Sequence, residues 1–276
     1  MNHSSVQNDP AGSKLTGLRP STGVVVDRET VELKRLEKRI GRVHLQQRLG
    51  IEADHATQIF GRGRTFFHIE NWYSIHAFIR LVLRGLGLYG RGLSNAAAIA
   101  IRHNEVILPK LPEAFDGFTL LHLSDLHLDM DPAYPAALIE RLQQVDYDIC
   151  VMTGDFRAKT YGDHDAAIAA LAEVRPHLRG PVYAILGNHD SIRMVPGIEA
   201  LGIGLLLNES VVLERDGARI HLAGIDDPHY YQVDNFDKAT ANIAPEELSI
   251  LLSHSPETYR HAAHADFDLM LSGHTH

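Results

Sequence analysis

After Pro109 the chain alternates short apolar runs with longer stretches in which apolar residues recur every three or four positions. Short apolar runs predict buried strands, and the amphipathic stretches between them predict helices. Strands are expected at residues 119–123, 149–152, 182–186, 220–223, 249–252 and 269–271, and the helices include 133–144 and 165–178. Strands that alternate with helices are typical of a layered α/β domain.

The pattern before this region is different. Residues 1–23 are rich in Ser, Gly, Asn and Pro, which predicts a disordered tail. Residues 29–49 predict one amphipathic helix, whose apolar face is formed by Leu33, Leu36, Ile40 and Val43. A further helix is expected to begin at Ser94. We therefore predict a helical N-terminal region over residues 24–104 and an α/β domain over residues 105–276.

Residues 66–90 are more apolar and more aromatic than the rest of the N-terminal region. Arg80 and Arg84 interrupt them, and no apolar run approaches the roughly 20 residues that a membrane span needs. The surrounding segment 61–102 is basic, with six arginines and one glutamate. Two interpretations remain. The segment packs on the α/β domain, which we favour, or it lies on a bilayer surface, where aromatic and arginine side chains anchor well.

Composition restricts the class of protein. The net charge of −9, concentrated outside the basic segment, argues against a nucleic-acid partner because no basic stripe is available to follow a phosphate backbone. The single cysteine, Cys150, lies in an apolar run, which predicts a buried thiol and excludes an internal disulfide. Residues 1–20 show no secretory signal, so a cytoplasmic protein is expected.

Polar side chains follow five of the predicted strands. Because the carboxyl ends of parallel strands meet at one crevice, these side chains are expected to converge. They are Asp125 and His127 in SDLHL, Asp155 in TGDF, Asn188, His189 and Asp190 in GNHD, His254 in SHS, and His274 and His276 in SGHTH. In an extended segment, residues two apart point to the same side, so Asp125 and His127 could chelate one ion, as could His274 and His276.

The chemistry of this set points to metal ions. Carboxylates, an amide oxygen and imidazoles without a thiolate suit Mn, Fe, Zn or Co better than Ca, Mg or a structural zinc. Two such ions roughly 3.5–4 Å apart can clamp a phosphate and lower the pKa of a shared water, with Asp155 as the candidate bridge. Asp-X-His, Gly-Asp and the lone His254 are each more often turn or structural residues, whereas Gly-Asn-His-Asp and Gly-His-X-His are stronger signals. All five in order leave little room for that interpretation.

This ordered set, over residues 108–276, resembles the calcineurin-like metallophosphoesterase superfamily. The stretches LPEAFDGFTLLHLSDLHL, GIDDP and LLSHSPE are most similar to its bacterial phosphodiesterase-like branch. The resemblance implies an α/β/β/α sandwich that hydrolyses a phosphoester with two divalent metal ions and a metal-bound water. One metal would be held by Asp125, His127, Asp155 and His276, and the other by Asp155, Asn188, His254 and His274.

The resemblance also implies roles for residues that do not hold metal. His189 would contact the scissile phosphate and help to protonate the leaving oxygen, and Asp190 would orient the other ring nitrogen of His189. Arg157 could contact a phosphate oxygen, with an ordinary surface arginine as an equal alternative. Asp129, Asp131, His229 and Tyr230 are interpreted as ordinary loop residues.

Departures from related families narrow the function. Protein Ser/Thr phosphatases have a second Asp followed by Arg-Gly, which GDFRAKT lacks, and they have Glu where Asp190 stands. The lipid A pathway hydrolase of the superfamily has Arg where His189 stands. We therefore expect a phosphodiester or pyrophosphate substrate, nucleotide- or lipid-linked. Peripheral contact of residues 61–102 with the inner membrane face is the alternative to packing on the α/β domain.

Two further expectations complete the sequence-based picture. The alternative function is a catalytically silent metal-binding scaffold that acts through its N-terminal helices. It is disfavoured because such scaffolds usually lose ligands, whereas the full ligand set and His189 are present in this sequence. Members of the superfamily usually continue beyond the last motif, so C-terminal strands after His276 are expected to be missing from this chain.

Overall fold

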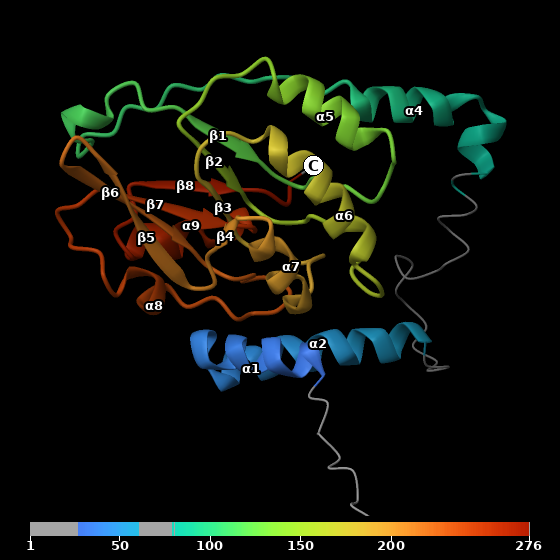
Figure 1. Cartoon of the computed structure of the whole chain (residues 1–276), viewed down its shortest axis with the longest axis horizontal. Coiled ribbons are helices and arrows are strands. Elements are labelled where there is room, and N and C mark those ends of the chain that lie inside the picture. The colour runs from blue at the N-terminus through green and yellow to red at the C-terminus, as the bar shows by residue number, and fades with distance from the viewer. Residues whose placement is uncertain (1–26, 61–78, 80, 276) are drawn as a thin grey trace, which may run out of the picture.

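The α/β domain is built from two sheets that pack face to face, with helices on their outer faces (Figure 1). The computed structural model describes residues 27–60, 79 and 81–275. The first sheet is parallel and has the order β1 (Leu120–Leu123), β2 (Ile149–Met152), β3 (Val182–Ala184) and β4 (Gly204–Leu205). The second sheet has the order β5 (Glu209–Arg215), β6 (Ala218–Gly224), β7 (Ser249–Ser253) and β8 (Leu269–Ser272), in which β5 and β6 are antiparallel.

Helices connect the strands and cover the sheets. The helices α5 (Tyr134–Leu142), α6 (Asp165–Val174) and α7 (Val195–Ala200) follow the strands of the first sheet, and α8 (Phe236–Thr240) and α9 (Tyr259–His264) belong to the second. Single 3₁₀ turns occur at η2 (Glu113–Phe115), η3 (Arg175–His177), η4 (Ile192–Met194) and η5 (Pro256–Thr258). The expected α/β/β/α sandwich is therefore confirmed.

Both faces of the central strands are buried, which explains why these strands read as continuous apolar runs. In β2, Ile149 and Val151 belong to the core between the sheets, whereas Cys150 and Met152 belong to the core under the helices of the first sheet. A third core lies between β7 and the helices α8 and α9. Cys150 is fully buried, as predicted, and burial raises the pKa of its thiol to about 12.

The six predicted strands are all present, with bounds shifted by a few residues, but β4 and β5 were missed. The first of these has two residues, too few to leave a pattern. The second lies at the edge of its sheet and is mostly half buried or exposed, and its short apolar stretch stands between charged residues in the sequence ESVVLER. An edge strand of this kind does not show the composition of a strand buried on both faces.

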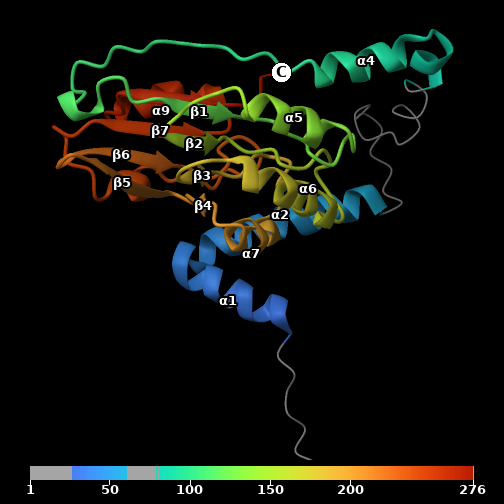
Figure 2. The same ribbon diagram turned by 45° about the horizontal axis from the view of Figure 1, so that its top comes forward.

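The prediction of one helix over residues 29–49 is wrong. Two helices, α1 (Arg28–Ile40) and α2 (Arg42–Phe60), are separated by Gly41, whose φ of 97° and ψ of 151° no helix contains. The break changes the buried face: Val43 is 79% exposed, whereas Leu45 and the charged Arg48 are buried. The two helices lie along the α7 side of the domain (Figures 1 and 2).

The helix α4 (Leu88–Ala97) lies on the other side of the domain, where it contacts α5 (Figure 1). This helix begins before Ser94, so the expected start was wrong. Most of the aromatic segment 66–90 falls outside the described residues. Within the described part, Leu81 and Leu86 are 69% and 66% exposed, whereas α4 contacts α5, so packing of the whole segment on the domain stays a prediction. No described helix has the length and apolar character needed to cross a membrane.

Candidate metal centre

The site lies at the carboxyl ends of β1, β2, β3, β7 and β8, where the loops are tied to one another by backbone hydrogen bonds. The amide of Asp125 donates to Gly154, that of His127 donates to Asp155, and that of Gly273 donates to His254, at 3.0–3.1 Å. These bonds hold together loops that are far apart in the sequence. The convergence expected from the positions of the motifs is confirmed for the described residues.

Four of the predicted ligands adopt left-handed backbone conformations. The φ angles are 52° at Asp125, 41° at His127, 59° at Asp155 and 69° at His274. Residues other than glycine rarely adopt such angles, and they cluster where the surrounding structure enforces a functional geometry. The expected extended segments at Asp125 and His274 are therefore wrong, since sharp turns, not strand alternation, direct these side chains to the centre.

Three histidine rings are oriented by backbone carbonyls. Nδ1 of His127 donates to the carbonyl of Arg157 at 2.8 Å, Nδ1 of His189 to that of Ala158 at 2.8 Å, and Nδ1 of His254 to that of Thr153 at 2.7 Å. A carbonyl can only accept, so each Nδ1 carries the proton and each Nε2 is available to a metal ion or a substrate. All three carbonyls belong to the loop that follows β2.

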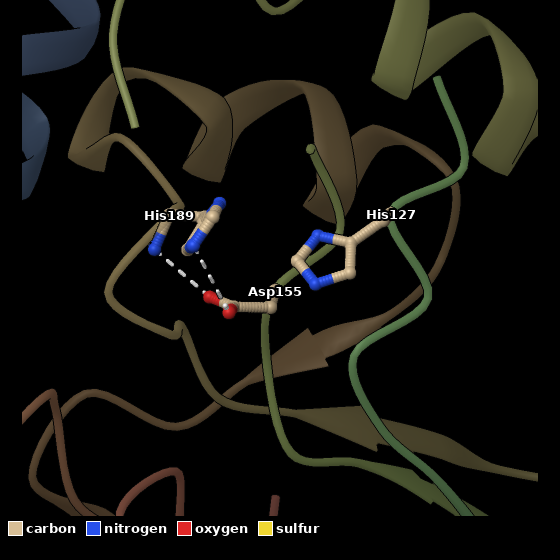
Figure 3. Close-up of side chains that lie close together, drawn as sticks. All are labelled: His127, Asp155 and His189. Carbon is tan, nitrogen blue, oxygen red and sulfur yellow. Dashed lines mark hydrogen bonds and ion pairs between the residues drawn. The ribbon is translucent and has the colours of Figure 1, made fainter. Parts of the chain in front are cut away.

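Asp155 is shared by two groups of potential ligands. The first is Asp155 with His127 and His189, and the second is Asp155 with Asp125 and His254; within each group the ligand atoms lie within 4.8 Å of one another. Figure 3 shows the first group, in which the rings and the carboxylate approach from three separate loops. Oδ2 of Asp155 lies 3.4 Å from Nε2 of His254 and 3.9 Å from Nε2 of His189.

The electrostatics of the cluster favour a cation. Burial lowers the pKa of His254, but the hydrogen bond and charge of Asp155 outweigh it and raise this pKa to about 9. Burial raises the pKa of Asp155, but His254 and His189 outweigh it and lower that pKa. The carboxylate cluster thus attracts positive charge to Nε2 of His254, where a divalent ion would compete with the proton. Oxygen and imidazole donors without thiolate fit such an ion.

The remaining predicted ligands are Asn188, His274 and His276, and the first two lie beside His254. Oδ1 of Asn188 lies 2.8 Å from Nε2 of His254, so the two can share an ion. The ring of His274 lies 5.1 Å from that of His254, and its amide donates to both carboxylate oxygens of Asp125 at 3.0 and 3.1 Å. His276 lies outside the described residues.

The predicted role of Asp190 is wrong. Its carboxylate does not receive the His189 ring, which bonds to Ala158 instead. It accepts amide hydrogens from Asp155 at 2.7 Å, Phe156 at 2.9 Å, Arg157 at 3.4 Å and Gly187 at 2.9 Å. Burial and the charge of Asp155 raise its pKa. Asp190 therefore joins the loops after β2 and β3 and shapes the backbone that carries the ligands.

Arg157 is buried, so its interpretation as a surface arginine is wrong. Its Nε donates to the carbonyl of His189 and its Nη1 to that of Gly162 at 2.9 Å, which ties the guanidinium to the loops rather than to solvent. Contact with a phosphate oxygen remains a prediction. Asp129 also has a structural role, because its Oδ1 accepts the amide hydrogen of Ala158 at 2.6 Å.

Sequence reasoning missed two charged residues of α2 that reach the loop after His189. Arg48 donates to the carbonyl of Asp190 at 2.7 Å, and Glu52 accepts from the amide of Ile192 at 2.8 Å. One signal for Arg48 was available in the sequence. Arg48 lies between Leu45 and Leu49, so a helix that packs these leucines against the domain also buries the side chain of Arg48. The supporting carbonyls of Thr153, Arg157 and Ala158 leave no signal in side-chain identity.

Comparisons with known proteins identify a family and several similar proteins. Residues 118–276 match the calcineurin-like phosphoesterase family. A transmembrane protein with metallophosphoesterase domain from Bos taurus is 30% identical over 67% of this chain and 46% of its own length. The uncharacterized metallophosphoesterase YkoQ of Bacillus subtilis is 30% identical over 57% of this chain and 60% of its own length. The solved calcineurin-like phosphoesterase YfkN of B. subtilis gives a TM-score of 0.39, with 15% identity, over 57% of this chain and 71% of its own.

The chain spans about half the length of the transmembrane relatives that it matches. The family match nevertheless covers more than half of this chain and includes every loop of the candidate metal centre. The chain therefore belongs to the calcineurin-like phosphoesterase family.

Proposed function

We propose that the chain hydrolyses a phosphoester, with a phosphodiester or pyrophosphate favoured, using two divalent metal ions and water as the nucleophile. Membership of a phosphoesterase family supports the reaction class. The observation that carries the proposal is the pair of ligand groups that share Asp155, because a shared carboxylate is what two neighbouring ions require.

Each metal-binding side chain has an assigned place in this proposal. Asp125, His127, Asp155 and His276 would hold one ion, and Asp155, Asn188, His254 and His274 the other. This assignment differs from the groups in the structure, because it pairs Asp125 with His127 instead of His254 and leaves His189 to the substrate. When bound, two ions would supply charge that holds the phosphate and lowers the pKa of the attacking water. The buried carboxylate of Asp155 and the carbonyl-anchored imidazoles of His127 and His254 hold their donor atoms in place.

His189 is proposed to give a proton to the leaving oxygen. Its side chain is 27% exposed, whereas that of His254 is fully buried, so the His189 ring is open to a substrate. The hydrogen bond from Nδ1 to Ala158 directs Nε2 towards Asp155 and the centre. In its imidazolium form the ring holds a second proton at Nε2, and this proton can pass to the leaving oxygen of a phosphate seated there, which leaves a neutral ring with its proton on Nδ1.

Hydrolysis of bis(p-nitrophenyl) phosphate and p-nitrophenyl phosphate tests the proposal. With Mn²⁺ the diester should be cleaved faster than the monoester, cleavage should stop with a chelator, and His189→Ala should lower it at least ~100-fold. Asp131→Ala serves as a control, because the side chain of Asp131 accepts the nearby amide hydrogen of Ala133 at 3.0 Å, at the start of a helix away from the ligand loops. A lack of turnover by protein shown to bind metal would favour the scaffold alternative.

Peripheral contact with a lipid surface is a second proposal. Leu81, Leu86 and Leu88 are 69%, 66% and 45% exposed, and the exposed Arg84 and Arg91 lie between and beside them in the sequence. Apolar side chains next to cations, with no acid from residue 81 to residue 104, are suited to an anionic bilayer surface.

Flotation with anionic vesicles tests this contact in the full chain. Deletion of the N-terminal region is unsuitable as a test, because α2 forms hydrogen bonds with the domain and its loss would disturb the fold. The double variant Leu81→Gln, Leu86→Gln should lose vesicle binding, whereas Val43→Gln, at a position 79% exposed on α2, should retain it. Equal flotation of all three proteins would refute lipid contact through this segment.

A further inference from the structure

The helix α2 lies outside the segment that matches the family, yet it is bonded to the loop that carries Asn188 and His189. Nη1 of Arg48 donates to the carbonyl of Asp190 at 2.7 Å. One turn further along, Glu52 accepts from the hydroxyl of Ser191 at 2.7 Å and from the amide of Ile192 at 2.8 Å. Three consecutive residues after His189 are thus held by two side chains of one helix.

The side chain of Arg48 is itself held in place by several contacts. It is fully buried, forms two hydrogen bonds to the carboxylate of Asp226 at 2.5 and 3.1 Å, and lies over the ring of Tyr231 at 3.7 Å. His44, one turn earlier in α2, contacts the same carboxylate at 2.6 Å. A bidentate pair between buried groups allows little freedom, so the donor offered to Asp190 is rigid.

The same helix also holds a second loop near the site. Gln47 donates to the carbonyls of Tyr231 and Gln232 at 3.0 Å. This loop includes His229, whose ring lies 5.9 Å from that of His274. One helix therefore connects the loop of His189 with the loop beside His274.

We propose that Arg48 and Glu52 are positioning residues for the reaction: α2 fixes the peptide of Asp190 from one side while the Asp190 carboxylate fixes it from the other, and this sets the place of His189. The proposal deepens and rests on the proposed function. Asp190 follows His189 directly, and its carboxylate binds the amides of Asp155 and Phe156. A shift of its peptide therefore moves His189 relative to Asp155, and small misplacements of reacting groups are costly in rate.

The test uses the full chain and three variants. Arg48→Lys retains the charge but loses the bidentate geometry. Glu52→Gln retains the shape, but an amide nitrogen that cannot accept replaces the carboxylate oxygen that accepts from Ser191 and pairs with Nη1 of Arg193 at 2.9 Å. Arg39→Met is the matched control. Arg39 also anchors these helices, through Glu199 at 2.5 Å and Glu209 at 2.7 Å, but it does not contact the loop of His189.

The first measurement is amide hydrogen exchange of peptides covering residues 187–193, without added metal. We expect Arg48→Lys and Glu52→Gln to speed exchange in this loop by ~10-fold or more, with the control close to wild type. This readout does not depend on turnover, so it remains decisive if the proposed function fails. Exchange like that of the control in both variants would overturn the proposal.

The second measurement separates positioning from general destabilisation. The turnover number is compared for bis(p-nitrophenyl) phosphate and diphenyl phosphate, at a temperature where every variant is folded and with metal content checked. A displaced proton donor should matter more for the poorer leaving group, so the loss in kcat should be ~10-fold or more for diphenyl phosphate and smaller for the nitrophenyl ester. Equal losses for both esters, or losses matched by Arg39→Met, would contradict a positioning role.

Discussion

Gly187 lies so close to Asp155 that a Cβ atom on Gly187 would overlap Oδ1 of the carboxylate. The contact is reciprocal, because a Cβ on Gly154 would lie 2.7 Å from the Cα of Gly187, and Gly154 has a φ of 93°. This close packing of the loops after β2 and β3 brings the amide of His189 within 2.8 Å of Oδ1 of Asp155. The glycines thus allow the carboxylate to reach the position that both ligand groups share.

Gly187→Ala is expected to weaken metal binding, because the added methyl group must displace Asp155. We expect Mn²⁺ affinity, measured by calorimetry, to fall at least ~10-fold, and the free energy of unfolding to fall by about 1–3 kcal/mol. Gly50→Ala in α2 is the control, since that position is open and helical; it should retain affinity and leave stability equal or slightly higher. Wild-type affinity in Gly187→Ala would show that Asp155 does not need this contact.

Asp129 is expected to affect catalysis through Ala158, whose amide it accepts and whose carbonyl orients His189. Asp129→Ala should release Ala158, allow the imidazole to rotate and lower kcat by ~10-fold, with a smaller change in KM. The nearby Asp131 accepts the amide of Ala133 at the start of α5, so Asp131→Ala should cost about 0.5–1.5 kcal/mol of stability without loss of kcat. Steady-state kinetics with urea unfolding separates the two outcomes, and equal kcat values would exclude the link through Ala158.

The parts of the site that are formed by side chains could be predicted from the sequence. Asp125, Asp155 and His254 each follow an apolar run, and strand polarity alone brings them together. The orientation of the rings could not be predicted, because the carbonyls of Thr153 and Ala158 that set it are present in every residue. For the same reason Asp190 was assigned to His189, although its carboxylate binds backbone amides.

The N-terminal helices show a different limit of sequence reasoning. The apolar positions from Leu33 to Val43 fit one helical face, but the conformation of Gly41 interrupts the helix and turns Val43 outward. A periodic pattern does not reveal such a break, since glycine is tolerated within a helix. The pairing of Arg48 with Asp226 depends on tertiary packing across 178 positions of sequence and has no local signature.

Gly41→Ala is expected to destabilise the protein although the position is open to solvent. The φ of 97° and ψ of 151° lie in a region that is essentially restricted to glycine, so alanine should cost about 1–3 kcal/mol. Thermal unfolding should show a lower Tm than wild type, whereas Gly50→Ala should show none of this loss. An unchanged Tm would indicate that the two helices can join without disturbing the contacts of Arg48.

Asp226 is expected to make stability depend on pH on the acid side. Burial raises the pKa of Asp226, but the charges and hydrogen bonds of Arg48 and His44 outweigh it and hold this pKa far below its usual range. Between the folded pKa and the unfolded value of about 3.9, protons bind the unfolded chain but not the folded one. The stability contributed by Asp226 is therefore full above about pH 4 and is lost as the pH falls below it.

Comparison of wild type with Asp226→Asn isolates this contribution. At neutral pH the variant should lose about 3–5 kcal/mol, because Arg48 would remain buried without its counterion. The difference in urea unfolding free energy should stay constant from about pH 7 to about pH 5 and should narrow as the pH falls below about 4, because wild type then loses the stability that the variant already lacks. Asp146→Asn, at an exposed pair with Arg179, should cost less than about 0.5 kcal/mol. A difference that stays constant down to the lowest pH would mean that Asp226 is not held ionised by Arg48.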